Sequence, residues 1–135
     1  SLNQQGVWVA CVGLGPVTHR ASHRIRYILG CLCGVPHGYT SCVILPAVLA
    51  WNSKQQASKQ ATINDALGNE GQDAAASVKA LVASLGLPTS LRDVDVSKEQ
   101  LPSIALRAAK HPVVRNNPRK INGANDVMEI LELAW

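Results

Sequence analysis

One segment of the chain, residues 38–51, is apolar on nearly every side when it is placed on a helix. Its sequence, GYTSCVILPAVLAW, contains no charged side chain. A helix without a polar face is stable when other elements surround it. Pro46 lies inside the segment and removes one backbone hydrogen bond, which predicts a kink. The segment therefore predicts a buried helix around which the rest of the chain must pack.

The remaining sequence is typical of short helices separated by turns. Gly30 and Gly86 are expected to end helices, and Pro102 is expected in a first helical turn. Val78, Leu81, Val82 and Leu85 recur at helical spacing. Asn122 or Asn125 is expected to cap the last helix. Helices are predicted over residues 17–29, 38–51, 54–69, 73–85, 101–110 and about 126–135, so the fold class is all-α, a bundle-like domain of about six helices.

Length and composition exclude several classes of protein. The 135 residues are enough for one domain, and residues 1–13 are expected to be a remnant or linker before a helical domain over 14–135. Hydrophobic residues make up 47% and charged residues 16%, which excludes a disordered chain. The basic residues form separate clusters, so no nucleic-acid partner is expected. No apolar run reaches about 18 residues and no signal peptide is recognised, so no membrane association and a cytoplasmic location are expected.

Two histidines mark the candidate site. His23 lies in the helix predicted over 17–29, with Tyr27 one turn further on, and His37 follows Pro36 at the start of the apolar helix. Two neutral imidazoles that converge from neighbouring helices form half of a divalent metal site. The alternative is a pair of core histidines with ordinary hydrogen bonds. Spacing alone leaves both open.

Other side chains admit two interpretations each. Cys31 and Cys33 could form a metal or redox site, or be two packed thiols of a reducing compartment. Arg115 and Arg119 could bind an acidic substrate or pair with carboxylates such as Asp93. Thr40 and Ser41 are expected to bond to the helix backbone rather than to act as nucleophiles.

The segment SHRIRYILGCLCGVPHGYTSCVILPAVLAWN, residues 22–52, resembles a signature in the C-terminal helical domain of the iron-containing (group III) alcohol dehydrogenases. The matching features are His23, Leu29-Gly30, Pro36-His37-Gly38, Leu45-Pro46 and Asn52. GLPTSLRDVDVSKEQLP, NNPRKING and ILELAW further along also resemble this superfamily. The likeness is greatest to the maleylacetate reductase-like members, and it covers about residues 14–135. The implied fold is the metal-binding, dehydroquinate synthase-like helical domain.

The resemblance implies roles for three residues. His23 and His37 match the family's third and fourth metal ligands, for iron or, in some members, zinc. Tyr27 stands where many members have a histidine near the nicotinamide and substrate, so its phenol is the candidate catalytic hydrogen-bond donor. The implied activity is NAD(P)-linked oxidation or reduction of a small alcohol, aldehyde or maleylacetate-like acid. The metal would polarise the reacting oxygen, and NAD(P)H would carry the hydride.

The chain also departs from the family pattern. The family's first two ligands, an Asp and a His, precede the matching segment, and no residue before His19 is an Asp or a His. The nucleotide-binding domain is likewise expected to be absent, so no cofactor-binding residue is assigned. Arg24 and Arg26 replace small residues. Two functions remain. The first is an oxidoreductase domain that contributes half of the metal site, either as a homo-oligomer or together with a chain that supplies the nucleotide domain. The second is a truncated, catalytically inactive helical module with a structural or interaction role.

Overall fold

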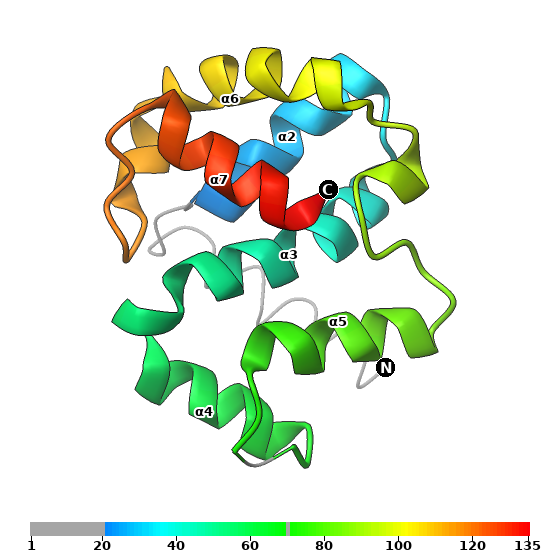
Figure 1. Ribbon diagram of the computed structural model, residues 1–135, viewed down its shortest axis with the longest axis vertical. Coiled ribbons are helices and arrows are strands. Elements are labelled where there is room, and N and C mark those ends of the chain that lie inside the picture. Colours follow the sequence, from blue (N-terminus) through cyan, green and yellow to red (C-terminus); the bar gives the residue numbers. More distant parts are fainter. Residues whose placement is uncertain (1–20, 70) are drawn as a thin grey trace, which may run out of the picture.

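The computed structural model describes residues 21–69 and 71–135 (Figure 1). Within these ranges no strand is found, which confirms the all-α prediction. The predictions that concern residues 1–20, including the linker and the start of the first predicted helix, lie outside the described residues. The α-helices are α2 (Ala21–Cys33), α3 (His37–Asn52), α4 (Ala57–Ala66), α5 (Ala74–Ser84), α6 (Leu101–Ala109) and α7 (Ala124–Ala134); the 3₁₀ turns are η1 (Ser53–Gln55), η2 (Arg92–Val94), η3 (Lys98–Gln100) and η4 (Pro112–Asn116).

Helix α3 runs through the middle of the domain, as its apolar sequence predicts. In Figure 1, α2 and α7 lie on one side of α3 and α5 lies on the other, with α4 next to α5. Helix α6 covers α2 and α7. Val43, Ile44, Ala47 and Trp51 of α3 are buried by these neighbours. The helix stays continuous through Pro46, which is itself buried.

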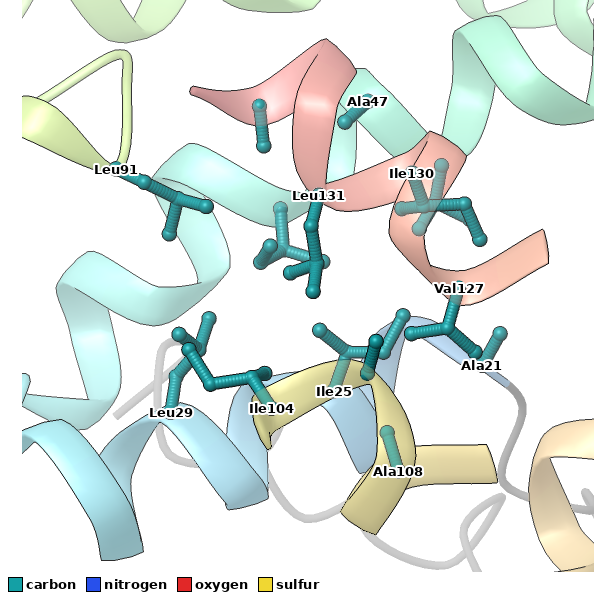
Figure 2. Close-up of a cluster of buried hydrophobic side chains, with 14 of the residues drawn as sticks. Ala21, Ile25, Leu29, Ala47, Leu91, Ile104, Ala108, Val127, Ile130 and Leu131 are labelled. Carbon is teal, nitrogen blue, oxygen red and sulfur yellow. The ribbon is translucent and has the colours of Figure 1, made fainter. Parts of the chain in front are cut away.

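The core lies between α2, α3, α6 and α7 (Figure 2). Ile25 and Leu29 contribute from α2, Ile104 from α6, and Ile130 and Leu131 from α7; each is at most 1% exposed. Ile25 and Leu29 are four residues apart, so both lie on one face of α2. That inward face leaves the side chains of His23, Arg26 and Tyr27 on other parts of the helix surface. None of the described helices is both long and apolar enough to cross a bilayer.

The end of α2 differs from the prediction. The helix passes through Gly30 and ends three residues later, at Cys33. Gly34 adopts a φ of +67°, and its N–H bonds to the Gly30 carbonyl at 3.1 Å. A left-handed residue after the last turn is the common way to end a helix, and glycine adopts it without strain. Of the two glycines, Gly34 is therefore the stop signal.

Helix α5 forms as predicted, but the two leucines at its C-terminal end are not buried. Leu81 and Leu85 are exposed, whereas Ala74, Ala75 and Ser77 are buried on the side toward α3. Small side chains let two helix backbones approach closely, which favours this orientation. The α5 N-terminus is capped by Asp73, whose carboxylate accepts the Ala75 N–H at 3.4 Å.

The start of α7 also differs from the prediction. The N-cap residue is Gly123, and neither Asn122 nor Asn125 caps the helix with its side chain. Instead, the Asp126 carboxylate accepts the backbone N–H of Asn122 at 2.7 Å. A carboxylate in the first turn is favourable near the positive end of the helix dipole, and here it also ties down the residue that precedes the N-cap. The predicted start of α6 is confirmed, with Pro102 in its first turn and a capping box between Ser97 and Gln100 just before it.

Asp93 organises the turn that leads into η2, and this yields a pH prediction. Its Oδ2 accepts the N–H groups of Thr89 and Ser90, each at 2.9 Å. These bonds, above all the one from Thr89, lower the pKa of Asp93. A lowered pKa adds stability above the ordinary value of about 4 that disappears as the pH falls through the lowered value. We therefore expect Asp93→Asn to reduce the loss of stability on acidification.

The measurement is urea unfolding of wild type and D93N between about pH 6 and about pH 2. The matched control is Asp95→Asn, because Asp95 is an exposed carboxylate two residues away and asparagine tolerates its φ of 59°. The expected difference is small, since Asp93 is exposed to solvent. Parallel pH profiles for wild type and D93N would contradict the prediction.

Candidate functional site

The three residues singled out by the sequence lie on α2 and on the first turn of α3. His23 is partly buried near the start of α2, and Tyr27, one turn further on, is 53% exposed. His37 is the first residue of α3 and is exposed. A three-residue connection joins the two helices, and they pack directly against each other. The two histidine-bearing turns therefore belong to one helical hairpin.

A link through Arg26 connects the two turns. One terminal nitrogen of its guanidinium, Nη2, lies 3.4 Å from His23 Nδ1, and the other, Nη1, donates to the Ser41 hydroxyl. The Ser41 hydroxyl also donates to the His37 carbonyl at 3.4 Å, and Thr40 donates to the same oxygen at 2.7 Å. The prediction that Thr40 and Ser41 bond to the helix backbone is confirmed. Burial lowers the pKa of Arg26.

The contact between Arg26 and His23 restricts the imidazole chemically. A guanidinium has donors and no acceptor, so Nδ1 of His23 must accept if the two groups are hydrogen-bonded. The neutral ring then carries its proton on Nε2. A metal ion binds an imidazole nitrogen that carries no proton, so Arg26 competes with a cation for His23.

The side chains of His23 and His37 are nevertheless of a type that binds metal ions. Imidazole nitrogens are good ligands for iron and zinc, and α2 and α3 present one each. Among residues 21–69 and 71–135, no group of three His, Cys, Asp or Glu side chains could hold an ion. His23 and His37 could therefore serve as two ligands of a shell that residues outside this part of the chain complete.

Tyr27 and Arg24 make a second side-chain contact on α2. The Arg24 guanidinium stacks over the Tyr27 ring, with its central carbon 4.9 Å from the ring centroid. The stack is a cation–π contact, and it leaves a phenol on an exposed part of α2 that can donate or accept a hydrogen bond. The sequence marks Arg24 and Arg26 by their charge but gives no sign of the contacts that they make.

The alternative sites are weaker. Cys31 and Cys33 are free thiols, and burial raises the pKa of Cys33, which disfavours the thiolate that metals and oxidants need. Arg119 forms an ion pair with Glu129 at 3.3 Å, so for Arg119 the ion-pair interpretation is confirmed, with Glu129 rather than Asp93 as its partner.

A buried amide pair was not anticipated from the sequence. Asn52 at the end of α3 and Asn117 after η4 exchange two hydrogen bonds, of 3.2 Å and 2.6 Å. The Asn52 oxygen also accepts the Arg119 N–H at 3.3 Å. Two of the segments that carry the family resemblance, 65 residues apart, are therefore joined at this point.

Comparison with known proteins identifies the family. Residues 4–135 match the model described as Fe-containing alcohol dehydrogenase family, C-terminal. Lactaldehyde reductase of Escherichia coli K12 is 31% identical over 139 residues, covering 96% of this chain and 36% of the enzyme. Maleylacetate reductase of Pseudomonas knackmussii is 28% identical over 119 residues, covering 87% of this chain and 32% of the enzyme. The crystal structure of maleylacetate reductase from Agrobacterium tumefaciens superposes with a TM-score of 0.74 at 26% identity, covering 85% of this chain and 31% of that one.

The chain spans about a third of the length of these curated relatives. The family match covers nearly all of it, and the described helices have the fold of the matching part of the solved structures. The chain belongs to the Fe-containing alcohol dehydrogenase family, an oxidoreductase family, and corresponds to its C-terminal helical domain.

Proposed function

We propose that this chain is the helical domain of an NAD(P)-linked oxidoreductase in which His23 and His37 contribute two ligands of a divalent metal site. The observation that carries the proposal is the hairpin of α2 and α3, whose two histidine-bearing turns are linked through Arg26 and Ser41. The remaining ligands and the nucleotide-binding residues would come from a further part of the polypeptide, a second copy or another chain. The family match and the relatives named above support this assignment.

The residues of the chain would have distinct tasks. His23 and His37 would hold the ion from two helices whose packing keeps both turns in place. The bound iron or zinc supplies a Lewis acid that stabilises negative charge on the reacting oxygen. Tyr27 would donate a hydrogen bond from its exposed phenol to the substrate, and NAD(P)H would exchange the hydride. The substrate class is a small alcohol, an aldehyde or a maleylacetate-like acid.

The alternative, a catalytically inactive structural or interaction module, is favoured by one observation. Arg26 places a positive charge and hydrogen-bond donors against His23, where a metal ligand normally has an acceptor such as a carboxylate or carbonyl. Metal binding by the purified chain separates the two functions, because a module without catalysis has no need of it.

The test is a Co²⁺ titration followed by NMR of the histidine ring signals. We expect the His23 and His37 signals to broaden at lower Co²⁺ concentration than that of His111, which lies between α6 and η4 and is not a proposed ligand. We expect His23→Ala and His37→Ala each to weaken Co²⁺ binding by about tenfold or more, because each removes one of two nitrogen ligands. His111→Ala is the control and should bind as wild type does.

Two results would contradict the metal assignment. One is equal Co²⁺ affinity in wild type, H23A and H37A. The other is preferential broadening of His111 or of the cysteine signals. Circular dichroism of each variant confirms that a loss of binding is not a loss of the helical fold.

A further inference from the structure

The charges of this chain are unevenly distributed along the sequence. The first acidic residue is Asp65, so all 9 Asp and Glu residues follow position 64. The first 64 residues carry Arg20, Arg24, Arg26, Lys54 and Lys59. The half of the chain that holds both candidate metal ligands is therefore without any carboxylate side chain of its own.

Arg24 and Arg26 are partly buried, whereas Lys54 and Lys59 are exposed. The Nε atom of each is shielded from solvent and has no hydrogen-bond partner among the described residues. The ion pair found in the described part of the chain is that of Arg119 with Glu129, on other elements. Two partly desolvated guanidiniums thus have no counter-ion among the described residues, and an unpaired charge of this kind costs stability.

The side chains around the two arginines are rich in hydrogen-bond donors. Arg26 contacts Ser41 and His23, and Arg24 stacks on Tyr27. His23 and Tyr27 lie one turn apart on α2, and the two arginines lie between them in the sequence. Guanidinium, hydroxyl and phenol groups together suit an oxyanion, and the planar fork of arginine matches a carboxylate in particular.

We propose that Arg26 and Arg24 form an oxyanion subsite beside His23 and Tyr27, and that it receives a carboxylate group of the substrate. The choice of a carboxylate over a phosphate of the cofactor rests on the proposed function, in which Tyr27 and His23 face the substrate. The substrate is then a hydroxy or oxo acid rather than a simple alcohol. A bound carboxylate supplies the negative charge that no described residue places beside these two guanidiniums.

The experiment is a titration of the purified, metal-free chain with succinate, followed by amide NMR shifts of α2 and the first turn of α3. We expect Arg26→Gln to weaken succinate binding by about tenfold or more, since hydrogen bonds to charged groups are strong. Arg24→Gln is expected to weaken it in the same direction. Arg107→Gln is the matched control, because Arg107 is an exposed arginine of α6, and it should bind succinate as wild type does.

Arg26→Lys separates charge from geometry. Lysine keeps the positive charge but has no planar group that can donate two parallel hydrogen bonds to a carboxylate. R26K should therefore bind succinate more tightly than R26Q and more weakly than wild type. Dimethyl succinate, the neutral ester with the same carbon chain, should not shift these signals. Helical circular dichroism of every variant shows that a change in binding does not come from unfolding.

Three results would overturn the subsite. They are equal succinate affinity in wild type and R26Q, equal binding of dimethyl succinate, and no shift in α2 at any succinate concentration. Tighter Arg26-dependent binding of inorganic phosphate than of succinate would overturn the choice of carboxylate. Because the titration contains no metal, it is independent of the Co²⁺ experiment. A wild-type chain that binds succinate through Arg26 but does not bind Co²⁺ through His23 and His37 contradicts the metal assignment alone, and the reverse contradicts the subsite alone.

Discussion

Replacing Trp51 with alanine is expected to lower the free energy of unfolding by about 3–5 kcal/mol. Trp51 lies in the last turn of α3 and is 4% exposed. Its Nε1 donates to Glu129 of α7 at 2.8 Å, and the Arg119 guanidinium lies 3.8 Å from its ring centroid. One side chain thus joins α3, α7 and the loop before α7. Its removal leaves a large cavity and deprives Arg119 of its stacking surface.

Trp51→Phe is the matched variant, because it keeps an aromatic ring and removes the hydrogen bond to Glu129. Glu129 is exposed and can be hydrated, so we expect a smaller loss of about 1–2 kcal/mol. The measurement is urea unfolding at neutral pH, followed by circular dichroism. The prediction would be wrong if W51A unfolded at nearly the wild-type urea concentration, or if W51F and W51A were equally destabilised.

Replacing Asn52 with leucine is expected to cost about 2–3 kcal/mol, although leucine is apolar and Asn52 is buried. The substitution removes the partner of the Asn117 amide and of the Arg119 N–H. Each buried polar group left without a partner costs about 1–3 kcal/mol. Asn117 keeps its bond to the Arg119 carbonyl at 2.8 Å, which limits the loss.

A double-mutant cycle tests this explanation. Replacing both partners by apolar groups removes the unpaired amide as well, so N52L/N117L should be destabilised less than the sum of N52L and N117L, by about 1 kcal/mol or more. Asn125→Leu, at an exposed position of α7, should change stability by less than about 0.5 kcal/mol. Additive single substitutions would show that the two amides do not stabilise each other.

The helices whose burial pattern is unambiguous could be predicted from the sequence. Residues 38–51 have no polar face, and α3 is accordingly surrounded by α2, α5 and α7. The start of α6 is marked by Pro102 and the capping box. These signals are local: they depend on side chains within one or two turns, so the sequence contains all the necessary information.

The predictions that were wrong depended on choices between equivalent local signals. Gly30 and Gly34 can each end a helix, but the chain turns left-handed at Gly34. Asn122 and Asn125 are each a possible N-cap by residue type, but the cap is Gly123, and the Asp126 bond to Asn122 accompanies this choice. Helix α5 itself forms as predicted, but only the tertiary structure shows that Leu81 is exposed while Ala74, Ala75 and Ser77 are buried toward α3.

For the candidate site, too, some features could be predicted from the sequence and others could not. The residue types and spacing of His23, Tyr27 and His37, together with the family resemblance, followed from the sequence. The contacts of Arg26 with His23 and Ser41 did not, because they depend on how α2 and α3 cross.

By itself, the sequence determined that this chain forms helices, that α3 is the buried one, and which family it belongs to, because periodicity, composition and short motifs are properties of neighbouring residues. Only the tertiary structure decided which guanidinium meets which imidazole, and that Asn52 bonds to Asn117 across 65 residues. Such pairings depend on the distance and angle between packed helices. Many distant contacts set that geometry together, and no single segment contains it.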